Sequence, residues 1–216
     1  PVIPHPDKKG RSGISLPWMA YGYGVLMTPM QTLTFYNAIA NDGVMVRPRF
    51  IEGTQNTRSQ IKKQSEVEII NPSICSKETI GKVKSMLKGV VEKPWGTAHN
   101  IYDPNFAISG KTGTCQLDYN TEEVQYVASF VGYFPSDQPK YSCIVVIHRP
   151  DKEKGYFGNQ VAAPVFQTIA HKLYSSIPRE TKLSRDRYLE ITGNKNETNQ
   201  SVVKVDVKLT KTQKKS

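Results

Sequence analysis

Residues 108–116, ISGKTGTCQ, hold the groups in this chain that are best suited to bind another molecule. One cation, Lys111, stands between two glycines and beside the hydroxyls of Thr112 and Thr114. If the run lies on a strand, the glycines let a ligand approach the backbone, and free N–H groups can stabilise an oxyanion. This chemistry suits a carboxylate and a carbonyl held along the strand. The alternative is a glycine-containing strand end with one solvated lysine.

Other site chemistries find little support in the sequence. A phosphate loop would require glycine where Phe106 stands. The three cysteines and four histidines lack metal-ligand spacing, so we expect no metal and no cofactor. Two short patterns would mark a serine nucleophile and its neighbours, S-x-x-K and S-x-N. S-x-N does not occur, and S-x-x-K matches start at Ser59, Ser85 and Ser201. Because so short a pattern arises by chance, we expect no serine nucleophile in this chain.

The positive charge is concentrated toward the end of the chain. The net charge is +10, and residues 177–216 hold 10 basic and 5 acidic side chains, half of the excess. No basic stripe or zinc-finger spacing occurs, so nucleic acid is not an expected partner. We predict a folded domain over 1–177 and a polar, basic, flexible tail over 178–216. An anionic membrane surface is the weaker interpretation of the tail.

Three helices are predicted, over 28–43, 77–93 and 162–175. The first begins with Thr28, Pro29 and Gln31, which is a capping-box pattern with proline at the first helical position. Each helix repeats apolar residues at intervals of three and four, which predicts one buried face.

Three strands are predicted after the second helix, beginning at Phe106 and over 124–135 and 141–150. The turn at 136–139 makes the last two an antiparallel hairpin. The third strand is almost wholly apolar, as is typical of a central strand. Helices, consecutive antiparallel strands and a closing helix together predict an α+β fold, with helices packed on an antiparallel sheet.

Weaker predictions concern the flanking segments. Residues 44–53 and 65–72 are predicted as two strands joined by a polar loop. The aromatic, glycine-rich run at 18–25 is expected to form a buried turn or short strand. Residues 201–210 alternate like a strand within the polar tail.

Several runs together resemble the class B penicillin-binding proteins. Residues 21–50, YGYGVLMTPMQTLTFYNAIANDGVMVRPRF, resemble a glycine-rich turn followed by the family's "TPLQ" helix. WGTA, SGKTGTCQ, YVASFVGYFP and VAAPVF resemble the family's later motifs, in order and spacing across 18–175. The resemblance implies the C-terminal half of a transpeptidase domain, hence an incomplete transpeptidase fold. It also implies that a strand pair from the N-terminal part covers one sheet edge.

The resemblance implies roles for individual residues of the Lys-Thr-Gly strand. Lys111 would supply charge for the substrate carboxylate and for the serine's proton network. Thr112 and Thr114 would bind the carboxylate through their hydroxyls, beside Gly113, and the Thr114 N–H would form half of the oxyanion hole. Lys111 and Thr114 are thus the expected catalytic residues. Cys115 replaces the usual alanine, as a small residue in a buried site or as a thiol with lowered pKa.

The resemblance also implies a parent activity, a peptidoglycan D,D-transpeptidase of the division or elongation type. Such an enzyme forms a serine acyl-enzyme with D-Ala-D-Ala stem peptides, and β-lactams acylate the same serine. Implied partners are stem peptides, β-lactams and the proteins of division or elongation, and the wording of the "TPMQ" helix favours division.

The implied location is the outer, periplasmic face of the cell membrane, with an anchor outside this chain. With the serine outside it too, the chain alone is expected to be inactive. A fragment of a serine β-lactamase or β-lactam sensor, and a non-enzymatic basic module for anionic polymer or membrane, are the alternatives.

Overall fold

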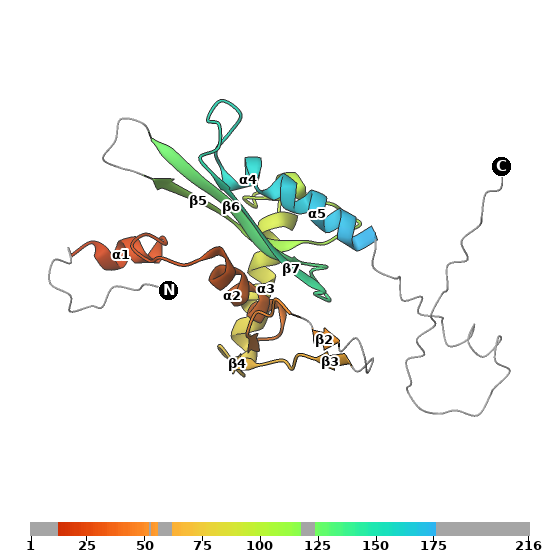
Figure 1. Cartoon of the computed structure of the whole chain (residues 1–216). Coiled ribbons are helices and arrows are strands. Elements are labelled where there is room, and N and C mark those ends of the chain that lie inside the picture. The colour runs from red at the N-terminus through yellow and green to blue at the C-terminus, as the bar shows by residue number, and fades with distance from the viewer. Residues whose placement is uncertain (1–12, 52, 56–61, 118–123, 176–216) are drawn as a thin grey trace, which may run out of the picture. The chain divides into compact units, whose positions relative to one another are not determined.

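A computed structural model describes residues 13–51, 53–55, 62–117 and 124–175 (Figure 1). The chain divides into two compact units, 1–174 and 175–216. All elements described below belong to the first unit, apart from the last residue of the final helix. The predicted tail and the predicted strand at 201–210 lie outside the described residues.

Three antiparallel strands form the main sheet in the order β5 (Ser109–Leu117), β6 (Gln125–Phe134) and β7 (Tyr141–His148). The β6–β7 hairpin is confirmed. Within the described sheet β7 lies at an edge and not at the centre as predicted, because among the described strands it pairs only with β6. Its apolar character comes from packing on both faces: Cys143 and Val145 contact the core under α5, and α2 contacts the strand from the other side.

The larger core lies between the sheet and the C-terminal helices α4 (Gly158–Val161) and α5 (Ala163–Ser175). Phe166 of α5 packs edge-to-face against Phe130 and Phe134 of β6, with ring centroids 4.8 and 5.6 Å apart. All three rings are fully buried. Since buried aromatic rings are among the largest sources of apolar stabilisation, this cluster fixes α5 on the sheet.

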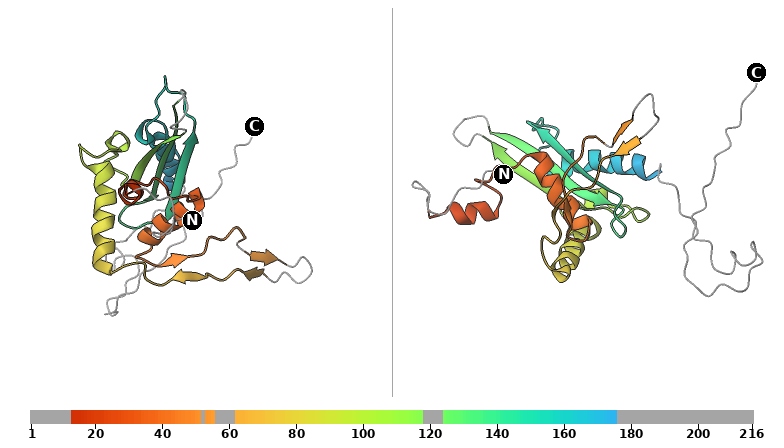
Figure 2. Two further views of the ribbon diagram at one scale, coloured as in Figure 1. Left: turned by 90° about the vertical axis from the view of Figure 1, so that its left-hand side faces the viewer. Right: turned by 60° about the horizontal axis from the view of Figure 1, so that its bottom comes forward.

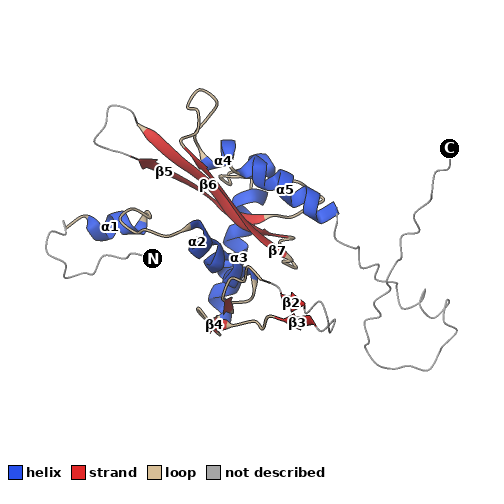
Figure 3. Ribbon diagram, viewed as in Figure 1, coloured by secondary structure: helices blue, strands red, loops and turns tan. Residues whose placement is uncertain are grey.

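The opposite face of the sheet is covered by α2 (Pro29–Ala40) and α3 (Lys77–Glu92), as Figures 1 and 3 show. Ile39 of α2 and Leu87 of α3 meet Tyr133 of β6 in a second apolar cluster. The predicted capping box is confirmed: Gln31 N donates to Thr28 Oγ1 at 3.2 Å, and Thr28 N donates to Gln31 Oε1 at 2.9 Å. All three predicted helices therefore form, with ends within three residues of those predicted.

The segment between α2 and α3 differs from its prediction. β1 (Met45–Val46) pairs with β4 (Ile69–Asn71), and β2 (Gly53–Gln55) pairs with β3 (Lys62–Gln64) in an arm that leaves the sheet (Figure 2). Each expected strand is thus shortened, to β1 and to β4, and the expected loop instead contains β3 and most of β2. Pro48 explains the early end of β1, because it has no N–H to donate to a ladder.

The aromatic run at 18–25 is neither buried nor a strand. A short helix, α1 (Ser15–Ala20), is followed by turns at Gly22 and Gly24, whose φ values are +92° and +73°. Trp18 packs edge-on against Tyr23, 5.3 Å between centroids, and Tyr21 is 85% exposed. Trp18 and Tyr23 therefore contact each other, and Tyr21 faces solvent. No helix in the described part of the chain has the length and apolar content to cross a membrane.

Candidate functional site

The Lys-Thr-Gly residues lie on β5, at an open edge of the sheet. Within the described strands β5 pairs only with β6, in a register that sets Lys111 opposite Val131 and Thr112 opposite Phe130. Residues paired in this way point to the same face, and successive residues alternate between faces. One edge of the Lys-Thr-Gly backbone is therefore available to an extended ligand.

Two glycines face each other on β5 and β6 at the start of this run, where the surroundings leave no room for a side chain. Gly110 stands opposite Gly132. A Cβ on Gly110 would lie 2.6 Å from Phe130 Cζ, and a Cβ on Gly132 would lie 2.1 Å from the Ser109 carbonyl oxygen. Since no side chain fits at either position, the sequence before Lys111 is constrained by packing as well as by chemistry.

Lys111 is a cation whose described contacts are with the strand itself. Its Nζ donates to the Thr112 carbonyl oxygen at 2.9 Å and lies 3.3 Å from Thr112 Oγ1. None of the salt bridges between described residues includes it. Partial burial lowers the pKa of the Lys111 ammonium, because it removes water that stabilises the charge. An anionic ligand would supply the counter-charge that the described residues do not.

Thr112 and Thr114 face a hollow of about 290 Å³ next to the strand. The remaining lining residues are Thr97, Phe157, Gly158 and Asn159. The Oγ1 atoms of Thr97 and Thr112 lie 3.0 Å apart, and Gly158 N donates to Thr114 Oγ1 at 3.1 Å. Both hydroxyls of the Lys-Thr-Gly run are thus oriented by neighbours from other elements.

The loop after α3 brings Thr97 to the strand. Lys93 ends the helix and Ala98 N donates back to the Val90 carbonyl at 3.0 Å, which folds the intervening WGT turn against the helix end. Gly96 is required in this turn, because its Cβ would lie 2.3 Å from that same carbonyl oxygen. Thr97 therefore stands on a turn closed by backbone contacts.

The N-terminus of α4 closes the hollow from the other side. A Cβ on Gly158 would lie 2.4 Å from the Ser129 carbonyl oxygen and 2.6 Å from that of Gly113. Tyr156 stacks on Tyr126 of β6 with ring centroids 4.2 Å apart, and its ring also contacts that of Phe157 in a tilted arrangement at 4.4 Å. At Gly158 the main chain of α4 therefore contacts the main chain of β5 and β6, and aromatic rings lie beside this contact.

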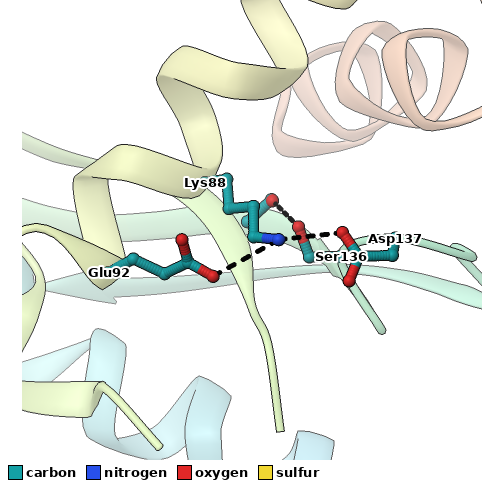
Figure 4. Close-up of polar contacts among 5 residues, drawn as sticks. Lys88, Glu92, Ser136 and Asp137 are labelled. Atoms are coloured by element: carbon teal, nitrogen blue, oxygen red, sulfur yellow. Dashed lines mark hydrogen bonds and ion pairs between the residues drawn. The ribbon is translucent and has the colours of Figure 1, made fainter. Parts of the chain in front are cut away.

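A polar brace, formed by Lys88, Ser109, Ser136 and Asp137, fixes the start of β5 (Figure 4). Ser109 Oγ lies 2.5 Å from Ser136 Oγ, and Ser136 N donates to the Ala107 carbonyl at 2.8 Å. Lys88 of α3 donates to Asp137 at 2.9 Å and also lies 3.4 Å from Glu92. Because Ser109 is two residues before Lys111, the brace connects α3 and the β6–β7 turn to the candidate site.

The S-x-x-K match at Ser85 has the wrong surroundings for an activated serine. Ser85 is exposed on α3, and its Lys88 is engaged by Asp137 and Glu92. The hydrogen bond that Lys88 donates to Asp137 is the main cause that raises the pKa of Lys88, whereas a lysine base needs a lowered pKa. Ser59 and Ser201 lie outside the described residues.

Cys115 does not fill a buried site, so that prediction is wrong. Its side chain is exposed, and Sγ donates to the Gln116 carbonyl at 3.4 Å. Partial desolvation raises the pKa of the thiol, opposite to what a reactive thiolate requires. The described residues also contain no group of three or more His, Cys, Asp or Glu side chains that could hold a metal ion.

Sequence reasoning placed Lys111, Thr112, Gly113 and Thr114 together, and the structure keeps them on one strand. It did not assign Thr97 or residues 157–159 to the site. These residues lie at the site because of tertiary contacts: Gly158 contacts Thr114, which is 44 residues away in the sequence. Only the glycines in WGTA and FGN mark these turns in the sequence.

Comparison with known proteins assigns most of the described chain to one family. The family model described as "Penicillin binding protein transpeptidase domain" matches residues 6–171. Stage V sporulation protein D of Bacillus subtilis is 32% identical over 154 residues, covering 69% of this chain and 23% of that protein. Peptidoglycan D,D-transpeptidase FtsI of Buchnera aphidicola is 30% identical over 169 residues, covering 77% of this chain and 28% of its own length. The chain thus spans about a quarter of the length of these curated relatives.

Solved structures give the same result for the fold. Penicillin-binding protein 3 of Mycobacterium tuberculosis, complexed with ampicillin, is similar with a TM-score of 0.67 and 29% identity, over 82% of this chain and 40% of that one. The transpeptidase domain of penicillin-binding protein 3 from Burkholderia pseudomallei has a TM-score of 0.63 and 28% identity, over 82% and 50%. The α+β arrangement of helices on an antiparallel sheet is therefore part of a penicillin-binding transpeptidase fold.

Proposed function

Because the chain belongs to the family of penicillin-binding protein transpeptidase domains, we propose that it forms the Lys-Thr-Gly side of a serine acyl-transfer site. The parent reaction is peptidoglycan D,D-transpeptidation. A serine attacks the carbonyl of a D-Ala-D-Ala stem peptide, D-Ala leaves with a proton, and an amine of a second peptide then displaces the serine from the acyl group. β-Lactams are the inhibitory substrates of the same serine.

One observation carries the proposal. A cation without an acidic partner among the described residues stands beside two hydroxyls on an open strand edge, next to a hollow. Lys111, Thr112 and Thr114 are the groups that would bind the carboxylate terminus of the peptide or of the β-lactam. An extended ligand along β5 would pair with its backbone through Gly113, which leaves room for close approach, and the Thr114 N–H would face the oxyanion.

We infer that the nucleophilic serine is supplied by sequence other than these 216 residues. The absence of S-x-N and the ion-paired state of Lys88 support this inference. The open edge of β7 supports it too, because half-buried apolar residues on an edge strand suit further strands pairing there. By itself, the chain is then an incomplete site without transpeptidase activity.

The remaining assignments follow from the family. The substrates are stem peptides of the cell wall, so the domain works on the outer, periplasmic side of the cell membrane, with division or elongation proteins as partners. Residues 1–177 would be the transpeptidase part and 178–216 a flexible basic tail. One relative is named as a peptidoglycan D,D-transpeptidase, which supports the assignment of the parent reaction.

The test is covalent labelling with a fluorescent penicillin, followed by a denaturing gel. The full-length protein encoded by the gene should give a covalent band that unlabelled ampicillin abolishes, and the 216-residue chain should give none. A band on the 216-residue chain, mapped to Ser59, Ser85 or Ser201, would contradict the assignment of the nucleophile. No band on the full-length protein would contradict the proposed function.

A further inference from the structure

Thr97 stands in the loop after α3 and contacts one of the two site hydroxyls. Its Oγ1 lies 3.0 Å from Thr112 Oγ1, and both side chains line the hollow. Thr97 is not part of the Lys-Thr-Gly strand; it reaches this position because backbone contacts close the WGT turn. The fold of this turn therefore holds the Thr97 hydroxyl at the site, although Thr97 lies outside the Lys-Thr-Gly strand.

The hydrogen-bonding capacity of Thr112 explains what this contact can do. A hydroxyl has one proton to donate and two lone pairs to accept with. Lys111 Nζ, which can only donate, lies 3.3 Å from Thr112 Oγ1 and occupies one lone pair. If Thr97 donates to the second lone pair, both lone pairs of Thr112 Oγ1 are occupied. The Thr112 O–H can then act only as a hydrogen-bond donor, and the ligand is the acceptor.

We propose that Thr97 is a positioning residue that makes the Thr112 hydroxyl a hydrogen-bond donor to the ligand carboxylate. Without ligand, Thr112 can donate to Thr97. When a carboxylate binds, the Thr112 proton turns to the anion and the Thr97 proton turns to Thr112, so that no hydroxyl loses its partner. The inference rests on the proposed function, because it assigns the anion to a peptide or β-lactam carboxylate.

The contact can be tested with substitutions that separate the hydroxyl from the shape of the side chain. Thr97→Val keeps the branched shape and removes the hydroxyl, and Thr97→Ser keeps the hydroxyl. Thr168→Val is the matched control, because Thr168 lies on α5 and its Oγ1 donates to the Pro164 carbonyl of the same helix at 2.9 Å. All variants are made in the full-length protein.

The measurement is the second-order rate of acylation by benzylpenicillin and by its methyl ester, which lacks the negative charge. Thr97→Val should lower the benzylpenicillin-to-ester ratio of these rates by about 10-fold, the size expected for one hydrogen bond to a charged group. Thr97→Ser should restore the ratio, and Thr168→Val should leave it unchanged. Because the ratio is taken within one variant, partial unfolding cancels.

The outcomes separate the two proposals. If wild-type protein is acylated and Thr97→Val retains its ratio, or if Thr97→Ser fails to restore it, the role of Thr97 is wrong and the proposed function stands. An equal loss with penicillin and ester also overturns it, since that result indicates a structural effect alone. If the wild-type protein is acylated by neither compound, the proposed function fails and this inference fails with it.

Discussion

At the scale of single residues, Lys111 is the group whose chemistry is most specific. Its amine lies against the strand backbone instead of a carboxylate, and partial burial lowers its pKa. A cation that has no acidic partner among the described residues can exchange its weak backbone contact for an incoming anion. That is the property expected of a carboxylate-binding lysine.

The lowered pKa of Lys111 predicts an alkaline limit to β-lactam acylation. As pH rises through this pKa, the ammonium becomes neutral and the attraction for the carboxylate is lost. The acylation rate should therefore begin to fall at a lower pH than that at which a free lysine titrates. Lys111→Gln in the full-length protein should reduce acylation about 100-fold near neutral pH and remove this limb of the pH profile. Lys77→Gln, at the exposed start of α3, is the control. An unchanged profile in Lys111→Gln would show that another group titrates.

At the scale of elements, the sheet and its helices are held by a few positions where only one residue type fits. Gly110 and Gly81 make a matched pair. A Cβ on Gly110 would collide with the Phe130 ring, whereas a Cβ on Gly81, within α3, has no neighbour within 4 Å.

Alanine should therefore have opposite effects at these two glycines. Gly110→Ala should lower the free energy of unfolding by about 2 kcal/mol, because the strands must separate or Phe130 must move. Gly81→Ala should raise it by about 0.5–1 kcal/mol, because alanine favours the helix. Denaturant unfolding of the full-length protein measures both. Equal stability of the two variants would show that β5 and β6 adjust without cost.

The polar brace gives a second prediction at this scale. Lys88 binds both Asp137 and Glu92, with a side chain 32% exposed, whereas among the described residues Lys82 pairs with Glu78 alone and is 66% exposed. Lys88→Met should therefore lower the free energy of unfolding by about 1 kcal/mol, and Lys82→Met by less than about 0.5 kcal/mol. If both changes are neutral in thermal unfolding, the ion pairs contribute nothing to fixing β5.

The elements also show what the sequence could and could not predict. The capping residues Thr28 and Ser76 act through local hydrogen bonds, so α2 and α3 were predictable from spacing alone. The position of β7 at an edge was not, because pairing partners are a property of the whole sheet. The contact of Gly158 with Thr114 was equally hidden, since nothing local requires it. Family resemblance identified the candidate strand, and only tertiary structure added Thr97 and Phe157 to it.

At the scale of the whole molecule, charge and fold point to different functions. The excess of positive charge belongs half to residues 177–216, whereas the fold belongs to a penicillin-binding transpeptidase domain. The basic-module alternative from the sequence depends on the tail alone. The two parts can therefore be tested separately.

Removal of residues 178–216 from the full-length protein should leave penicillin labelling unchanged, because every residue of the candidate site precedes Pro178. Any binding to DNA or to vesicles of anionic lipid should disappear with the tail, since the tail carries half of the excess positive charge. Labelling by fluorescent penicillin and co-sedimentation with vesicles measure the two properties. Salt-sensitive binding that survives the deletion would place a basic surface on the folded part.

The contact between Gly158 and β5 has a consequence for how this site can vary. The hollow is bounded here by the backbone of Gly158, at the start of α4, which contacts the backbone of β5. A side chain at Gly158 would displace Gly113. Under the proposed function, changes that alter acylation by β-lactams therefore have few options there. They should accumulate instead on the exposed rim, where Phe157 can be exchanged while the main chain stays in place. Resistance by altered shape would then be a property of the rim, with the backbone contact unchanged.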